Sequence, residues 1–344
     1  MGHQKGSKYK RWMKLGFLAF LVIGTVLIIR QQQAMPYQHD EGMVFGTVYH
    51  IAYQSDKNYK ADIERELQKV DNALSMFNQE SVISRINRNE DVVVDKMFKE
   101  VFQLAERVSQ ETDGAFDITV APLVNAWGFG FKEGVHPDQH TVDSLLHIIG
   151  YEHVKCQDDR IVKGDRRMML DCSAIAKGYG CDVVARMLKK KGVNNYMVEI
   201  GGEVATAGVN DQREPWHIGV NAPSPSGDGD SGKLQAVLKL KDKALATSGN
   251  YRNFYYMGGK KYAHTIDPKT GYPVQHNILS ATVLANDCAT ADAYATAFMV
   301  MGLDGAREVL EKHSELMAYL IYTDEKGKYS IWYSPSMRQR IIEE

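Results

Sequence analysis

The sequence has 344 residues, of which 44% are hydrophobic and 24% are charged, and its formal net charge is -2 at pH 7. These proportions are ordinary for a globular protein that buries a sizeable core, and the length allows one large domain or two. The near-neutral charge, with no basic stripe interleaved with aromatic residues, gives no reason to expect a nucleic-acid partner. Four cysteines without metal-type spacing predict free thiols and no disulfide framework.

The first 30 residues have the features of a membrane-targeting segment. Lysines and an arginine between positions 5 and 14 precede the 15-residue apolar run from Leu15 to Ile29. As a helix this run would span roughly 22 Å, which suits either a cleaved signal peptide or a signal anchor. Because no small-residue cleavage site and no lipoprotein-type cysteine follow, we expect residues 1–30 to be an uncleaved, single-pass inner-membrane anchor. The basic flank then places the rest of the chain in the periplasm, after a linker over residues 31–42.

Strand and helix signals mix over residues 43–344 without a regular alternation. The predicted strands lie over 43–53, within 151–171 and 195–220, and over 234–248, 261–266, 279–285 and, as a closing hairpin, 316–333. The predicted helices lie over 61–77, 94–112 and 173–191 and begin again at Thr290 and Asp304. A surface loop is predicted over 223–232. This order predicts an α+β fold with mixed, largely antiparallel sheets flanked by helices, in a single compact catalytic domain.

Polar groups concentrate in the segment from His264 to Pro273. It places an imidazole, a carboxylate and two hydroxyls around an Asp-Pro-x-x-Gly turn, directly after an alternating run. Binding and catalytic residues often lie on such a turn, although an ordinary surface turn has the same sequence signals. His264 suits general-base chemistry or hydrogen-bond donation to a phosphate near neutral pH, and Asp267 could orient it or bind a ligand.

Two further segments have a similar character. A turn leads into the helix predicted over 173–191, whose free N–H groups can face an anion, and Lys177 adds a positive charge there. In the helix that begins at Thr290, Asp292 and Thr296 are four residues apart and therefore on one face. Their oxygens are of the class that Mg²⁺ prefers. The alternatives are a solvated lysine and an aspartate that complements the helix dipole.

Together these segments resemble the FAD:protein FMN transferase family, the ApbE-type flavin transferases. Further matches are the runs Gly114 to Val120 with Pro122, Leu123 and Trp127, Ser248 to Arg252, and Ser75 with Phe77 and Ser81 to Asn87. The matches occur in the family's order from about Phe45 to about Pro335, with Phe45 standing where the family usually has methionine.

The resemblance implies an enzyme that cleaves FAD, releases AMP and attaches FMN through a phosphoester to a Thr or Ser of a target redox protein. It implies Mg²⁺ as the metal, held by Asp292, Thr296 and the backbone carbonyl of Ala174. The implied FAD contacts are Phe45, Ser75, Met76, Phe77, Asp117, Lys177, His264 and, through its backbone, Ile266. His264 and Asp267 are the implied catalytic residues, and which of them is the general base stays open.

The implied acceptors are the flavin-carrying subunits of membrane redox pumps of the Na⁺-translocating quinone reductase and Rnf type. Two alternatives remain, namely an FAD pyrophosphatase that gives FMN and AMP, and a non-catalytic FAD-binding protein. The binding protein would need neither the pair Asp292 and Thr296 nor His264. A sequence from Asp228 to Gly232 partly resembles the family's acceptor motif, so self-modification at Ser231 is a further hypothesis.

Overall fold

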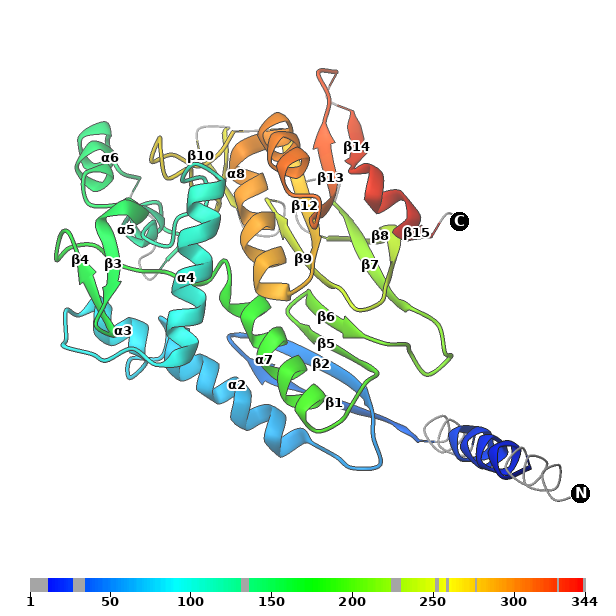
Figure 1. Ribbon diagram of the computed structural model, residues 1–344. Coiled ribbons are helices and arrows are strands. Elements are labelled where there is room, and N and C mark those ends of the chain that lie inside the picture. Colours follow the sequence, from blue (N-terminus) through cyan, green and yellow to red (C-terminus); the bar gives the residue numbers. More distant parts are fainter. Residues whose placement is uncertain are drawn as a thin grey trace, which may run out of the picture.

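The computed structural model describes residues 12–26, 35–130, 136–223, 230–250, 254–257, 260–275, 277–326 and 328–342. Its centre is an eight-stranded sheet in the order β1-β2-β5-β6-β9-β12-β13-β14, in which every neighbouring pair is antiparallel. Helices cover one face of this sheet (Figure 1). The predicted α+β class with largely antiparallel sheets is therefore confirmed.

The strands fall into four sheets. The central sheet contains β1 Tyr37–Val44, β2 Thr47–Gln54, β5 Tyr196–Ile200, β6 Glu203–Ala207, β9 Ala244–Gly249, β12 Ile278–Ala285, β13 Met317–Thr323 and β14 Tyr329–Tyr333. A second sheet, in the order β15-β8-β7, contains β7 Trp216–Pro223, β8 Asp230–Leu240 and β15 Ile341–Ile342. Two hairpins stand apart, formed by β3 Val154–Gln157 with β4 Arg160–Lys163 and by β10 Phe254–Met257 with β11 Lys260–Ala263.

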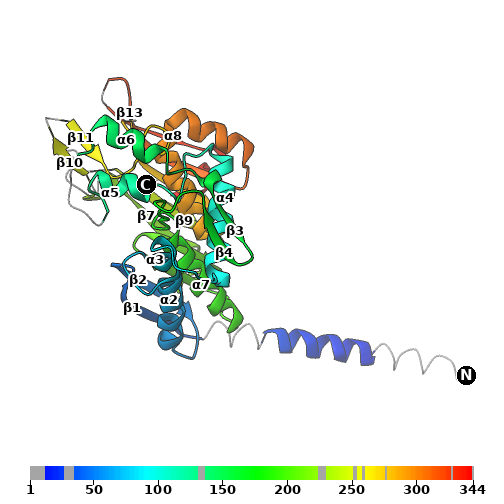
Figure 2. The same ribbon diagram turned by 90° about the vertical axis from the view of Figure 1, so that its left-hand side faces the viewer.

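The helices form a layer on the central sheet. The longer ones are α2 Lys60–Leu74, α4 Lys96–Glu111, α7 Ala176–Lys190 and α8 Cys288–Lys312. The shorter ones are α3 Val82–Asn87, α5 Ala121–Ala126, α6 Gln139–Leu146 and the 3₁₀ turns η1 Tyr151–His153 and η2 Pro335–Arg340. The helix α8 packs on β9 and β12, α7 packs on β5 and β6, and the two helices contact each other (Figures 1 and 2).

Side-chain alternation along the strands explains the layers. In β13, Ala318 and Leu320 belong to the core beneath the helices, whereas Tyr319 and Ile321 face the other way into the core shared with β7 and β8. This period of two is the expected consequence of an extended strand buried on both faces. The central sheet therefore lies between two hydrophobic cores and contributes side chains to both.

The bounds of α4 follow from its sequence. The side chain of Asp95 caps α4 by accepting a hydrogen bond from the N–H of Phe98 at 2.8 Å. After the helix, Asp113 and Gly114 both take positive φ angles, of 51° and 75°, which ends the helical course of the chain. The predicted free thiols are also confirmed, since Cys172, Cys181 and Cys288 are buried and Cys156 is partly exposed, all without disulfides.

Some predicted boundaries were wrong. The run predicted as one strand over 43–53 is a hairpin, because Phe45 and Gly46 both have positive φ, of 52° and 74°, and turn the chain between β1 and β2. Consequently β1 begins at Tyr37, and residues 37–42 of the predicted linker form part of a strand. The prediction of two helices, from Thr290 and from Asp304, is by contrast confirmed, because Gly302 has a φ of 74° and interrupts the helical backbone within α8.

Parts of the sequence predictions lie outside the described residues. Residues 12–26 form a helix, and in the described part of the chain no helix combines the length and the apolar character needed to cross a membrane. Because residues 1–11 and 27–34 are not described, the anchor over 1–30 stays a prediction. Residues 224–229 of the predicted loop are likewise not described, and β8 already begins at Asp230, so the hypothetical acceptor Ser231 lies on a strand.

Candidate active site

A cavity of 420 Å³ lies where the beginnings of α7 and α8 meet β9 and the segment after β11. Nine of the residues predicted for the site line it, namely Met76, Phe77, Asp117, Ala174, Lys177, His264, Ile266, Asp292 and Thr296. They come from segments that are up to 220 residues apart in the chain. Phe45, Ser75 and Asp267 do not line it.

The two helices approach each other closely at Gly178 in the first turn of α7. A Cβ atom on this residue would lie 2.4 Å from the backbone oxygen of Cys288, at the start of α8. The N–H of Gly178 donates to Oδ2 of Asp292 at 3.1 Å. Only glycine permits this approach, which brings the carboxylate of α8 to the N-terminal end of α7.

The beginning of α8 is fixed by capping carboxylates. Asp287 caps the helix through the N–H of Thr290 at 2.9 Å, and Asp182 of α7 accepts the N–H groups of Cys288 and Ala289 at 2.8 and 2.9 Å. These bonds set the rotation of α8, so that its next turns present Asp292 and Thr296 to the cavity. Burial leaves Asp292 only 2% exposed.

A hydroxyl network supports Thr296. Its Oγ1 atom lies 3.2 Å from Oγ of Ser248, which is on β9 beneath α8. Thr247 also lines the cavity, and its Oγ1 lies 2.9 Å from Oγ1 of Thr282 on β12. The predicted placement of Asp292 and Thr296 on one helix face is therefore confirmed, and the sheet orients the hydroxyl.

Lys177 forms an ion pair that the sequence did not predict. Its Nζ lies 2.6 Å from Oε1 of Glu203, the first residue of β6, which is only 3% exposed. The other carboxylate oxygen of Glu203 is buried and has no hydrogen-bond partner among the described residues. Glu203 escaped notice because the local sequence marks only the preceding Gly201 and Gly202 as a tight turn.

The buried carboxylates of Glu203 and Asp292 and the partly exposed Lys177 all line the cavity. Burial raises the pKa of Glu203, the charge of Asp292 raises it further, and Lys177 opposes both effects. Burial likewise raises the pKa of Asp292, against the effect of Lys177. For Lys177 burial would lower the pKa, but the carboxylates of Asp292 and Glu203 hold it above its ordinary value. With both carboxylates ionised, the cluster carries one net negative charge.

His264 and Asp267 have different surroundings. His264 follows β11 and lines the cavity, with its ring edge-on to Phe129 at a centroid distance of 6.4 Å. The carboxylate of Asp267 instead holds its own turn, accepting hydrogen bonds from the N–H of Lys269 at 2.8 Å and the hydroxyl of Thr270 at 3.1 Å. The structure therefore brings only His264 of this pair to the cavity.

Asp117 shapes the wall of the cavity. Its carboxylate accepts hydrogen bonds from the N–H and hydroxyl of Thr119, both at 2.7 Å, and from the N–H of Tyr151 at 2.9 Å. Burial raises its pKa and these three bonds oppose the rise. Its carboxylate is thus occupied in holding two loops together.

Phe45 lines a separate cavity between β1 and α2, and Ser75 directly precedes the lining residue Met76. The ring of Phe45 packs against α7, where a Cβ on Gly180 would lie 2.8 Å from it. Ser75 accepts the N–H of Asn78 at 3.3 Å and so shapes the turn that carries Met76 and Phe77. Neither residue contributes to the lining of the 420 Å³ cavity.

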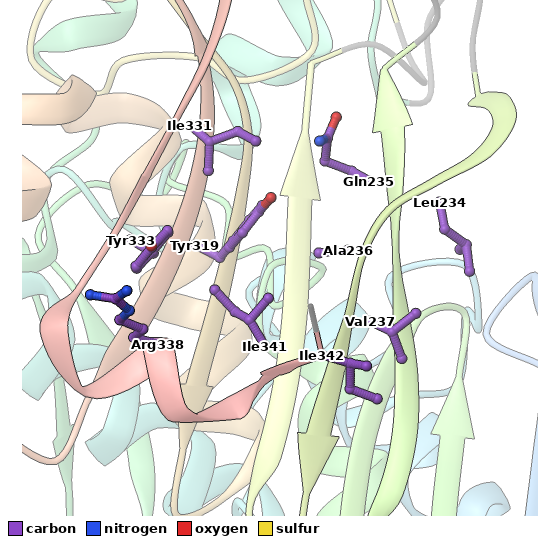
Figure 3. Close-up of a pocket in the computed structure, with 10 residues that line it drawn as sticks. All are labelled: Leu234, Gln235, Ala236, Val237, Tyr319, Ile331, Tyr333, Arg338, Ile341 and Ile342. Carbon is purple, nitrogen blue, oxygen red and sulfur yellow. The ribbon is translucent and has the colours of Figure 1, made fainter. Parts of the chain in front are cut away.

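A second cavity, of 330 Å³, lies on the opposite face of the central sheet, between β8, β13, β14 and β15 (Figure 3). Tyr319 and Tyr333 stack there with ring centroids 6.2 Å apart. Arg338 contributes the only charged side chain among the described residues that line it, and the rest of the lining is largely apolar. None of the predicted site residues is present, so the cavity between α7 and α8 is the candidate active site.

The donor set of the candidate site restricts which metal it suits. Among the described residues, no group of three or more His, Cys, Asp and Glu side chains could hold a metal ion. The carboxylate of Asp292, the hydroxyl of Thr296 and the carbonyl of Ala174 are hard oxygen donors. Mg²⁺ fits such a set because it commonly takes only one or two carboxylates and completes its shell with water and substrate phosphates.

Comparisons with known proteins agree with these observations. The sequence matches the model of the ApbE family over residues 45–321. The FAD:protein FMN transferase of Vibrio cholerae is 37% identical over 301 residues, which cover 84% of this chain and 89% of that protein. The Escherichia coli protein of the same name is 31% identical over 318 residues, covering 88% and 89%.

Solved structures show the same similarity. The flavin transferase ApbE from Vibrio cholerae superposes with a TM-score of 0.80 at 34% identity, covering 89% of this chain and 99% of that one. The flavinyl transferase ApbE of Pseudomonas stutzeri superposes with a TM-score of 0.79 at 27% identity, covering 89% and 97%. The family resemblance drawn from the motifs is confirmed.

Proposed function

The chain belongs to the ApbE family, and we propose that it is an FAD:protein FMN transferase. It cleaves the P–O–P bond of FAD, forms a P–O bond between FMN and a Thr or Ser hydroxyl of a target protein, and releases AMP. The observation that carries the proposal is the convergence of Lys177, His264, Asp292 and Thr296 on one cavity. The names of the related proteins support the same activity.

The cavity supplies the elements that phosphoryl transfer requires. Such a reaction needs positive charge on the phosphates, fixed positions for the reacting groups and a proton acceptor for the attacking hydroxyl. Lys177 and the N-terminal end of α7 offer positive charge to the pyrophosphate. His264 takes the proton of the acceptor hydroxyl, because it is the member of its motif that lines the cavity.

We also propose that the reaction depends on Mg²⁺. Asp292, Thr296 and the backbone carbonyl of Ala174 would hold the ion, and their common location on the cavity supports this assignment. Ser248 would keep the Thr296 hydroxyl in position. When bound, the ion would neutralise charge on the phosphates.

The proposed location is the periplasmic side of the inner membrane, with residues 1–30 as an anchor. The basic flank and apolar run of the sequence support it. The proposed acceptors are flavin-carrying subunits of membrane redox pumps of the Na⁺-translocating quinone reductase and Rnf type. The related proteins' names support a protein acceptor in general.

Mass spectrometry tests the proposed function. The purified full-length protein is incubated with FAD, Mg²⁺ and a fragment that carries the sequence Asp-Gly-x-Thr-Gly-Ala-Thr. A fragment heavier by one FMN moiety, with AMP released, is the expected result, and Asp292→Ala should abolish it. Free FMN and AMP without an adduct would instead identify an FAD pyrophosphatase, and intact bound FAD would identify a binding protein.

A further inference from the structure

Lys177 has two buried carboxylates near it but forms an ion pair with only one. Its Nζ pairs with Oε1 of Glu203 at 2.6 Å, and the described residues show no ion pair between Lys177 and Asp292. Asp292 is nevertheless close to the lysine, because it accepts a hydrogen bond from the N–H of Gly178, the next residue in the chain, and both side chains line the same cavity. Asp292 is therefore a second carboxylate near the lysine.

The hairpin of β5 and β6 holds Glu203 in a fixed position. Glu203 pairs in register with Ile200, and the two intervening glycines, Gly201 and Gly202, have φ angles of 62° and 104°. Such a two-residue turn is a tight connection that leaves the flanking residues little freedom. The thiol of Cys181 also donates to the backbone oxygen of Glu203 at 3.3 Å. The glutamate is thus an anchored partner for a longer and more flexible lysine.

The same turn guides the stem of the lysine. A Cβ atom on Gly201 would lie 3.4 Å from Cδ of Lys177 and 2.8 Å from the methyl group of Thr47. Because Gly201 has no side chain, the aliphatic part of Lys177 can pass close to this turn and reach Glu203. Both the path and the end point of this side chain are defined by the β5–β6 turn.

The position of the lysine matters for Asp292. Among the described residues only one oxygen of Asp292, Oδ2, accepts a hydrogen bond, from the N–H of Gly178, and Asp292 lines the cavity. Without Glu203, the partly exposed ammonium of Lys177 and the buried carboxylate of Asp292 would be left as the natural pair, because a buried carboxylate without a partner is unfavourable. Lys177 would then occupy Asp292 and neutralise it.

We propose that Glu203 is a positioning residue that holds Lys177 away from Asp292 and thereby keeps Asp292 open to a divalent cation. The proposal rests on the proposed function in one respect, namely that Asp292 binds Mg²⁺. It adds a role for a residue that does not itself coordinate the ion. It also explains why the carboxylate of Glu203 is buried at a place where Lys177 and Asp292 alone would form a neutral pair.

Calorimetric titration of the flavin-free, full-length protein with Mg²⁺ tests this role. Glu203→Gln should weaken Mg²⁺ binding about tenfold, equivalent to about 1.4 kcal/mol, because it releases Lys177 toward Asp292. The double variant Glu203→Gln with Lys177→Met removes the competing ammonium and should restore the affinity to near that of the natural protein. Its recovery also shows that the glutamine variant fails through the lysine and not through misfolding.

A variant that keeps the negative charge at position 203 distinguishes the positioning of Lys177 from a direct electrostatic attraction between Glu203 and Mg²⁺. Glu203→Asp retains the carboxylate but withdraws it by one methylene from Lys177, so it should also weaken Mg²⁺ binding. If Glu203→Asp binds Mg²⁺ as well as the natural protein, or if Glu203→Gln does so, the positioning role is overturned. If the natural protein itself shows no Mg²⁺ binding, the assignment of Asp292 in the proposed function fails instead, and the inference fails with it.

Discussion

Replacing Gly178 by alanine should force α7 away from α8 at the point where both helices reach the cavity. The added Cβ would lie 2.4 Å from the backbone oxygen and 2.7 Å from the backbone carbon of Cys288. These are main-chain atoms at a capped helix start, so they cannot move aside as a flexible side chain would. One or both helices must shift, and the bond from Gly178 to Asp292 must lengthen.

The magnitude follows from three effects. Overpacking of this kind costs about 1–3 kcal/mol, and loss of a buried hydrogen bond to a carboxylate costs about 1.5–3 kcal/mol. The higher helix propensity of alanine offsets about 1 kcal/mol of this. We therefore expect Gly178→Ala to lower the free energy of unfolding by about 2–5 kcal/mol.

A matched control lies in the same helix. At Gly180 the added Cβ would meet the ring of Phe45 at 2.8 Å and Cδ1 of Ile200 at 3.2 Å, which are side-chain atoms that can shift. Gly180→Ala gains the same helix propensity and should change the free energy of unfolding by no more than about 1 kcal/mol. Equilibrium unfolding in urea measures both variants. A Gly178→Ala protein as stable as the Gly180→Ala protein would refute the argument that a backbone contact at Gly178 sets the distance between the helices.

Four further predictions concern pH, the base, the metal and the hydroxyl network. Burial and the nearby charge of Asp287 raise the pKa of Asp182 to about 7 from an unfolded value near 3.8, so its stabilising contribution is full below about pH 4 and is lost as the pH rises through 7. The contribution of Asp182 to the free energy of unfolding should change by about 4 kcal/mol over this pH range. Unfolding in urea from pH 4.5 to 8 should therefore show a larger loss of stability for the natural protein than for Asp182→Asn, and the same pH dependence in both proteins would contradict the prediction. His264→Ala should slow FMN transfer by about 10²–10⁴-fold while FAD still binds in equilibrium dialysis, whereas Asp267→Asn should mainly lower the melting temperature; equal rate losses would argue against this division. Removal of divalent ions with a chelator should abolish transfer, and added Mg²⁺ should restore it, whereas full activity in the chelator would exclude the proposed metal. Ser248→Ala should raise the Mg²⁺ concentration needed for half-maximal rate by about 10-fold, as expected of a residue that orients a metal ligand, and an unchanged Mg²⁺ dependence would show that Ser248 does not support Thr296.

Helices and their surface turns were predictable because their signals are local. In α2 the apolar spacing of Ile63, Leu67, Val70 and Leu74 corresponds to side chains that are all buried. The placement of Asp292 and Thr296 on one face needed only the helical period. Nine of the twelve site residues that the motif resemblance implied line the cavity, although no local signal specifies which strands are neighbours in the sheet.

The sequence predictions failed at residues whose structure or role is determined by tertiary contacts or by unusual backbone angles. Phe45 has a positive φ, which a phenylalanine rarely adopts, so the turn between β1 and β2 could not be read from its residue type. Glu203 gains its importance only from Lys177, which is 26 positions earlier and on another element. Asp267 belongs to a polar motif, but its hydrogen bonds to Lys269 and Thr270 turn it toward its own loop.

The four cysteines differ in exposure, so the rates at which their thiols are labelled can measure local opening of the protein. Cys172, Cys181 and Cys288 are buried with raised pKa values, whereas Cys156 on β3 is partly exposed. A thiol reagent should therefore label the folded protein at one position first. Cys181 and Cys288 lie on α7 and α8, which contact each other, and both are buried in one core cluster, so the slower labelling of these two thiols measures how often that part of the core opens to solvent.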